Sequence, residues 1–207
     1  MPPDHLRSRL LAHPPVAPAE PYATIPRGDH LYSPDLLAEL PEGSPKPAAV
    51  LIPIIPRLDG ATVLFTRRSA SLKNHPGQIA FPGGRIDDRD GGPLAAALRE
   101  AEEEIGLKAD QVELLGYLDF YQSTTGYRIT PVVGLVTPPI ALMLNPAEVD
   151  ETFEVPLAFL LDERNHRIES REWRGRLRSY VAIPYERHYI WGVTAGILRS
   201  LHERVST

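Results

Sequence analysis

Proline is distributed unevenly along this chain, and that distribution limits where a β-sheet core can form. Eleven of the 22 prolines lie before Ala48, within a chain of 207 residues. Proline fixes φ and lacks a backbone N–H, so a proline-rich segment wraps a folded domain more readily than it builds the domain's sheet. The sequence therefore predicts an N-terminal arm over residues 1–47 and one folded domain over residues 48–207, a length that suits a single hydrophobic core.

Charge and cysteine content exclude several classes of function. The chain carries 22 basic and 27 acidic residues, a net charge of −5, which gives no global attraction for nucleic acid or an anionic membrane. The absence of cysteine excludes a disulfide framework, a thiolate metal site and a cysteine nucleophile. The N-terminus lacks the pattern of a secretory signal, and no apolar run is long enough to span a bilayer. We therefore expect a soluble cytoplasmic protein.

Hydrophobic periodicity predicts a domain that mixes strands and helices. Residues 48–55 and 61–66 are β-branched runs around Leu58-Asp59-Gly60, the pattern of a hairpin, and Pro53 places part of the first strand at an edge or a bulge. Further strands are expected at residues 78–81, 112–120 and 129–136. Helices are expected at residues 94–105 and 189–205, with shorter ones near 156–162, 4–13 and 34–40. For the first twenty residues, a tail without fixed structure is the equal alternative.

The helix predicted over residues 94–105 ends in an unusual group of glutamates. At about 100° per residue, Glu100, Glu103 and Glu104 share one face, whereas Glu102 points elsewhere. Like charges four residues apart destabilise a helix, and acidic residues near its C-terminal end oppose its dipole. A bound Mg²⁺ or Mn²⁺ would reverse both effects, because these ions prefer carboxylate and phosphate oxygens. A solvated acidic face is the alternative interpretation.

The sequence around these glutamates resembles the Nudix box of the Nudix hydrolases. Its second half fits the family pattern at Arg99, Glu100, Ala101, Glu103, Glu104, Gly106 and Leu107. The first half begins at Gly84 and departs at Asp90, where the family has glutamate and one residue fewer before the arginine. The resemblance implies an α/β/α sandwich with a mixed sheet and hydrolysis of diphosphates linked to another moiety. It also implies metal binding by Glu100, Glu104 and Glu103, with Arg99 orienting a glutamate.

Residues 64–84, just before the box, are similar to a motif of the coenzyme A pyrophosphatases. The fit is at Thr66, Arg68, Ser69, His75, Gly77, Phe81, Pro82, Gly83 and Gly84. The resemblance implies coenzyme A or a derivative as substrate, with 3′,5′-ADP and 4′-phosphopantetheine as products. Such a substrate needs fixed positive charge near the metal, and Arg67, Arg68, Lys73 and His75 are candidates to supply it. Ser69, Gly83 and Gly84 complete the expected substrate-binding set.

Several assignments stay open at the level of sequence. If residues 64–67 form a strand, Arg67 and Arg68 face opposite sides, so at most one reaches the substrate. The general base is Glu103, or Glu148 or Glu151 from a later loop, and Tyr121 or Tyr127 could stack on adenine. Another nucleoside diphosphate derivative is an alternative substrate, and a non-catalytic nucleotide-sensing domain is an alternative class. The C-terminal apolar helix and the arm could support a homodimer.

Overall fold

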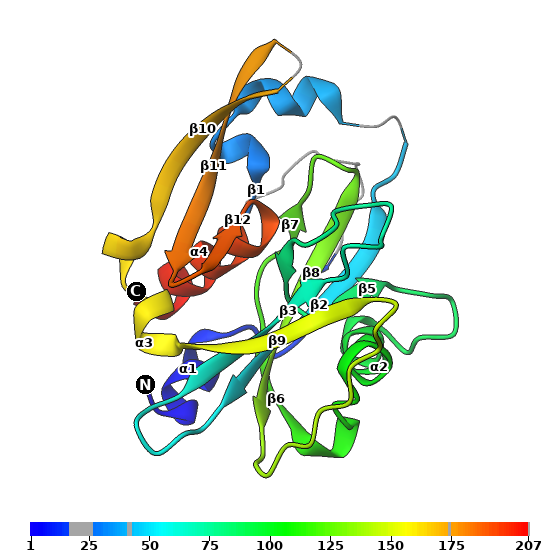
Figure 1. Cartoon of the computed structure of the whole chain (residues 1–207), viewed down its shortest axis with the longest axis vertical. Coiled ribbons are helices and arrows are strands. Elements are labelled where there is room, and N and C mark those ends of the chain that lie inside the picture. Colours follow the sequence, from blue (N-terminus) through cyan, green and yellow to red (C-terminus); the bar gives the residue numbers. More distant parts are fainter. Residues whose placement is uncertain (17–26, 41–42, 174, 207) are drawn as a thin grey trace.

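The computed structural model describes residues 1–16, 27–40, 43–173 and 175–206, which form two β-sheets with helices on both sides (Figure 1). The large sheet has the strand order β1-β7-β8-β2-β3-β4, with β5 on β2, β6 on β8 and β9 on β3, and the small sheet has the order β10-β11-β12. The strands of the large sheet are β1 (Arg27–Gly28), β2 (Lys46–Ile55), β3 (Thr62–Arg68), β4 (Ile79–Ala80), β5 (Gly83–Arg85), β6 (Val112–Tyr117), β7 (Tyr121–Gln122), β8 (Tyr127–Val136) and β9 (Val149–Pro156). The small sheet comprises β10 (Arg167–Trp173), β11 (Arg176–Tyr185) and β12 (His188–Trp191). The helices are α1 (Pro3–Arg9), α2 (Pro93–Ile105), α3 (Leu157–Leu160) and α4 (Val193–Ser206), with short 3₁₀ turns at Asp29–Leu31, Pro34–Glu39, Ala109–Gln111 and Glu163–Asn165.

Strand β2 is the centre of the large sheet and accommodates a proline there. It pairs in parallel with β8 over residues 46–54, while its other edge pairs first with β5 and then with β3. Leu51 N donates to Pro82 O on that second edge, at 2.8 Å. Because backbone N–H groups alternate along a strand, the Pro53 nitrogen faces the same edge, in the gap between the β5 and β3 ladders. Pro53 therefore lies in a central strand and not at the predicted edge or bulge. The strand tolerates it because Pro53 lies where this edge of β2 changes its pairing partner from β5 to β3.

The large sheet separates two apolar layers, which makes the fold an α/β/α sandwich. On one face, Ala97, Ala101 and Ile105 of α2 pack against a cluster that includes Leu51 and Val132. On the other face, Ile197, Leu198 and Leu201 of α4 belong to a cluster with Phe65 and Val133. This architecture, with its mixed sheet, is the predicted fold class. Among the described residues, no helix is long and apolar enough to cross a membrane.

The elements expected at residues 48–55, 61–66, 94–105 and 129–136 are present as β2, β3, α2 and β8, with ends that coincide or differ by one or two residues. The predicted C-terminal helix is too long at its start. Residues 188–191 form β12, and Gly192, with a φ of 62°, separates that strand from α4. The helix expected near residues 156–162 is the four-residue α3, and the strands β9, β10 and β11 are absent from the sequence prediction.

The N-terminal arm wraps the domain and also touches its sheet. Leu6 on α1 is buried, and His5 Nε2 lies 3.3 Å from the Val205 carbonyl oxygen of α4. Leu11 exchanges two backbone hydrogen bonds with Tyr117, and β1 pairs in parallel with β7. Within the described part of the first twenty residues, a helix is therefore present; residues 17–20 lie outside it. The division into an arm, 1–47, and a domain, 48–207, stays a prediction.

Candidate active site

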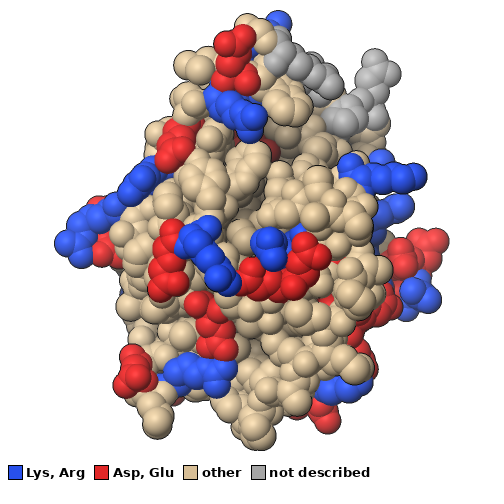
Figure 2. All heavy atoms as spheres, in the orientation of Figure 1, with Lys and Arg blue, Asp and Glu red and all other residues tan. Residues whose placement is uncertain are grey.

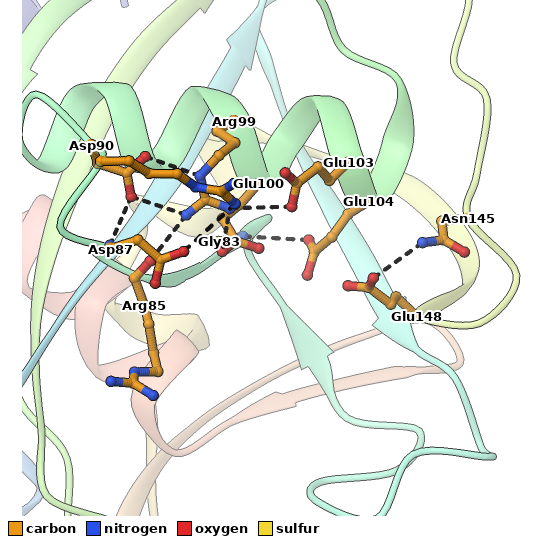
Figure 3. A network of polar contacts seen from close by, with 11 residues as sticks. Gly83, Arg85, Asp87, Asp90, Arg99, Glu100, Glu103, Glu104, Asn145 and Glu148 are labelled. Carbon is orange, nitrogen blue, oxygen red and sulfur yellow. Dashed lines mark hydrogen bonds and ion pairs between the residues drawn. The ribbon is translucent and has the colours of Figure 1, made fainter.

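The acidic cluster is formed where α2 lies over β5. Proline at its first turn starts α2, and Gly106 ends it in a left-handed conformation, with a φ of 70°. Glu104 is only 4% exposed and accepts a hydrogen bond from Gly83 N, at 3.3 Å. A Cβ atom on Gly84 would lie 2.4 Å from Glu100 Oε1, so only glycine lets the strand approach this side chain. Figure 3 shows Glu100, Glu103 and Glu104 along one side of the helix, as the sequence predicts.

Arg99 is held by Asp90 and in turn holds two of the glutamates. Its Nε and Nη2 atoms lie 2.9 and 3.0 Å from the two Asp90 carboxylate oxygens, a bidentate pair (Figure 3). Its Nη1 atom donates to Glu100 Oε1 at 3.0 Å and to Glu103 Oε2 at 3.1 Å. The hydrogen bonds from Arg99, followed by one from Asp87 N, lower the pKa of Asp90 to about 2. Asp90 is therefore a partner of Arg99, which resolves the role that the sequence left open.

A fourth acidic residue comes from the segment that precedes β9. Met143 N and Asn145 N donate to the carbonyl oxygens of Ile105 and Glu104, each at 2.9 Å, which ties this segment to the end of α2. Asn145 Nδ2 then donates to Glu148 Oε1 at 3.1 Å (Figure 3). The charge of Glu148 contributes to raising the pKa of both Glu100 and Glu104. Of the two later acids considered, Glu148 thus belongs to the cluster.

Glu151, the other later acid, belongs to a separate ion cluster. It contacts Arg67 at 3.1 Å, His188 at 3.3 Å and also Arg187, which links β9 to β3 and to the turn before β12. Burial opposes ionisation of this carboxylate, but the hydrogen bonds from Arg187 and His188 and the charges of both arginines together lower its pKa. We infer that Glu151 helps to dock the small sheet onto the large one.

Electrostatics of the cluster fit a bound cation. Burial raises the pKa of Glu104 to about 8, and the neighbouring charges of Glu100 and Glu148 add to that effect. Burial also raises the pKa of Glu100, against the favourable hydrogen bond from Arg99. In the described part of the chain, no three His, Asp or Glu side chains already converge as a ligand set. The oxygen donors and their unbalanced negative charge nevertheless suit Mg²⁺ or Mn²⁺; of the donors on α2, Glu104 is buried and Glu100 is partly buried.

The two candidate arginines of β3 serve different groups. Arg67 is paired with Glu151, as described, whereas the charge of Arg68 acts on Glu104 and lowers its pKa. The backbone register of β3 against β9 shifts between these two residues, which separates their environments. Of the pair, Arg68 is the one placed to meet an anion bound at the glutamates.

The loop between β3 and β4 carries the other candidates and begins next to Glu148. Ser69 N donates to Glu148 O at 2.8 Å, and the buried Ser69 hydroxyl lies 3.0 Å from Ser71 Oγ. Lys73 and His75 are exposed on the loop, and His75 adopts a positive φ of 55°. Ser69 therefore has a structural partner for its hydroxyl, while Lys73 and His75 remain accessible to a ligand.

Sequence reasoning misjudged one aromatic residue and missed one polar residue. Tyr121 is 2% exposed and donates to Asp29 Oδ1 at 2.8 Å, so the prediction that it stacks on adenine is wrong. Tyr127 faces Lys46, whose Nζ lies 5.7 Å from the ring centroid. Asn145, which positions Glu148, was missed because its sequence context, Leu144-Asn-Pro, reads only as a turn.

Comparison with known proteins identifies the family. The model of the NUDIX domain matches residues 45–174, more than half of the chain. The chain belongs to the Nudix family. A Nudix hydrolase named NudL, described as uncharacterized, from Photorhabdus laumondii is 45% identical over 158 residues, which cover 76% of this chain and 84% of the relative. The NudL of Escherichia coli K12 is 45% identical over 155 residues, covering 74% of this chain and 80% of its own.

A solved structure supports the fold of this Nudix protein. The MutT/nudix family protein from Enterococcus faecalis superimposes with a TM-score of 0.50 and 15% identity, covering 86% of this chain and 73% of the other. Nudix hydrolases act on nucleoside diphosphate derivatives and generally use divalent ions such as Mg²⁺ or Mn²⁺. The acidic cluster of α2 and β5 lies within the matched segment.

Proposed function

We propose that this Nudix hydrolase cleaves the diphosphate of coenzyme A or one of its derivatives, giving 3′,5′-ADP and 4′-phosphopantetheine. The observation that carries the proposal is the 2.8 Å hydrogen bond from Ser69 N to Glu148 O. This bond ties the loop that resembles the coenzyme A pyrophosphatases to the acidic cluster of the Nudix box. Substrate motif and hydrolytic motif would therefore act on one ligand.

In this proposal Glu100 and Glu104, with Glu103, hold Mg²⁺ or Mn²⁺. The ion, when bound, supplies positive charge that neutralises the diphosphate and lowers the pKa of water. Arg99 keeps Glu100 and Glu103 in place through its contacts at 3.0 and 3.1 Å. Glu148, oriented by Asn145, accepts the proton of the attacking water as the general base. Glu103, half-exposed and bound to Arg99, is the alternative base.

Substrate phosphates in this proposal are bound by the basic residues of β3 and its following loop. Arg68 approaches the cluster from β3, and Lys73 and His75 extend from the loop. The Gly83-Gly84 backbone lets the diphosphate lie against β5, where a side chain would collide with Glu100 or Val50. Arg67 takes no part in binding, because Glu151 already holds it.

Product chromatography with a substrate panel tests this function. The wild-type protein and Mg²⁺ or Mn²⁺ are incubated with coenzyme A, an acyl-coenzyme A, ADP-ribose, NADH and a dinucleoside polyphosphate. We expect metal-dependent formation of 3′,5′-ADP from coenzyme A, well above cleavage of the other compounds. Cleavage of the others alone would refute the coenzyme A assignment while leaving the hydrolase in place.

A matched pair of variants tests the role of the loop and strand. Arg68→Gln and Arg67→Gln remove the same charge from adjacent positions of β3. We expect the first to raise KM for coenzyme A roughly tenfold or more, because a phosphate loses a charged partner. The second should leave KM nearly unchanged and affect only thermal stability. Equal effects of the two changes on KM would contradict the proposed division of roles.

A further inference from the structure

Strand β10 has one paired edge and one open edge. All seven of its residues pair with β11, and it is the outermost strand of the small sheet, at the left of Figure 1. In the described part of the chain, no strand pairs with its other side. An open edge of this length presents unpaired backbone N–H and C=O groups that can bind another strand.

Most side chains of this hairpin are charged or polar (Figure 2), but three large apolar side chains are also exposed on it. Ile168 is 53% exposed, and Leu177 of β11, which lies opposite Glu172, is exposed on the same face of the sheet. Trp173, which is 49% exposed, lies on the other face. A strand that covers the edge would bury part of this apolar surface and, with an acid opposite Arg171, would add a favourable cross-strand ion pair.

We propose that two copies of this chain pair through their β10 strands, antiparallel, in a register centred on Ser170. In that register Glu169 of each copy lies opposite Arg171 of the other, and Arg167 lies opposite Trp173. The two opposite-charge pairs and the two arginine–aromatic pairs are all favourable cross-strand contacts. Tyr189 donates a hydrogen bond to Glu169, which fixes that carboxylate on the sheet surface. The two small sheets would then form one six-stranded sheet.

The charges of β10 select this register among its neighbours. Side chains alternate between the two faces along a strand, and residues directly opposite each other in a sheet point to the same face. If both copies show the same face, the two-fold axis that relates them must therefore pass through a residue position and not between two residues. A centre at Glu169 would place Glu169 opposite itself and Arg167 opposite Arg171. A centre at Arg171 would place Arg171 opposite itself. Of these three adjacent centres, the one at Ser170 opposes unlike charges. A centre at Ile168 also opposes unlike charges, Arg167 and Glu169, but it pairs three residues of β10 where the centre at Ser170 pairs all seven.

Single cysteines test the register, since the natural chain has none. Ser170→Cys should form a disulfide-linked dimer on mild oxidation, because directly opposite Cβ atoms approach bonding distance. Ile168→Cys and Glu172→Cys should each form no disulfide-linked dimer alone and should cross-link when mixed. Ser8→Cys, exposed on α1, measures random collision. Cross-linking of Ser170→Cys no faster than Ser8→Cys, or self-linking at residue 169 or 171, would overturn the proposal.

Charge reversal tests the pairing without cysteines. Sedimentation of the wild-type protein should show a concentration-dependent monomer–dimer equilibrium. Arg171→Glu and Glu169→Arg should each weaken the dimer roughly tenfold or more, and an equimolar mixture should restore it as a heterodimer. Glu172→Arg, which faces Ile168 in this register, is the control and should dimerise normally. A wild-type protein that stays monomeric at every concentration, or a mixture that fails to associate, would refute the pairing.

Discussion

At the scale of single residues, Glu104 is a carboxylate in an unfavourable environment, because it is largely shielded from water and lies near other negative charges. Its carboxylate is buried, receives one backbone N–H from Gly83, and lies near the charges of Glu100 and Glu148. A bound cation would strongly stabilise the charged form of this carboxylate, and removal of the cation would strongly destabilise it. Two predictions follow from this balance of charge and burial.

Glu104→Gln should abolish turnover and leave the fold intact. The amide keeps the size of the side chain but removes the charge that we assign to the metal, so kcat should fall about 100-fold or more. Glu102→Gln is the matched control, because Glu102 is exposed on another side of the same helix. It pairs with Lys108, which follows the end of the helix. Steady-state kinetics and circular dichroism compare the two variants. Full activity of Glu104→Gln would contradict the metal assignment.

The metal-free protein should lose stability as pH rises. Burial raises the pKa of Glu104 from 4.5 to about 8, so between these values the native state holds a proton that the unfolded chain releases. The contribution of this group to stability is thus complete below pH 4.5 and is lost as pH rises through about 8. Thermal unfolding in EDTA should show a falling Tm over this window, and Glu104→Gln should flatten it. An equal slope in both proteins would exclude Glu104 as the cause.

The residues of the site were predictable to different degrees. Glu100, Glu103, Glu104 and Arg99 follow from helical spacing and the family pattern, since all lie on one regular element. Asp90 could not be assigned, because the role of its carboxylate depends on how the loop from Gly84 to Pro93 folds back to Arg99. Glu148 could not be separated from Glu151 either, because their three-residue spacing spans the beginning of β9, where the chain changes environment.

At the scale of elements, strand β5 lies very close to helix α2 because Gly84 has no side chain. The backbone of Gly84 lies so near Glu100 that any Cβ would displace the carboxylate. The atoms that a Cβ on Gly84 would meet belong to the end of the flexible Glu100 side chain. The fold can therefore tolerate a substitution of Gly84, but the Glu100 carboxylate must move from its present position.

Gly84→Ala should therefore lower activity much more than stability. A displacement of Glu100 by about 1 Å is expected to reduce kcat roughly 100-fold. Gly91→Ala is the control, since a Cβ there meets no atom within 4 Å. Kinetics and urea unfolding of the two variants check this expectation. Unchanged kcat in Gly84→Ala would show that Glu100 does not need its present position.

Elements with one-sided apolar patterns were predictable, and elements without them were not. Helix α2 has proline at its start, glycine at its end and a regular apolar face, so its bounds are nearly those expected. Strand β10 is mostly polar on both faces and therefore carries no alternation signal. Strand β12 was assigned to the following helix, because Ile190 continues the helical spacing of Ile197 and Leu201 by chance.

At the scale of the whole molecule, the arm joins parts of the domain that are distant in sequence. Leu6 is 1% exposed, in the cluster that also contains Leu201 and Val205 of α4. Arg7 pairs with Glu113 of β6 at the surface. The apolar contact, not the ion pair, should therefore provide most of the stability that the arm contributes.

Leu6→Ala should destabilise the whole domain, by about 2–4 kcal/mol, because it leaves a cavity between α1 and α4. Arg7→Ala, one residue away on the same helix, should cost less than about 1 kcal/mol. Urea unfolding at equilibrium measures both. A small effect of Leu6→Ala would mean that α1 unfolds separately from the domain, and the arm would then be an accessory segment.

The contact between α1 and α4 also sets an order of events during synthesis. His5 and Val205, which meet in the native structure, are 200 residues apart in the chain. During synthesis α1 must therefore wait for α4, roughly 10–40 seconds at ordinary rates of translation. Until then Leu6 lacks the apolar side chains of α4 that cover it in the native structure, so the incomplete chain exposes an apolar surface that other chains can bind.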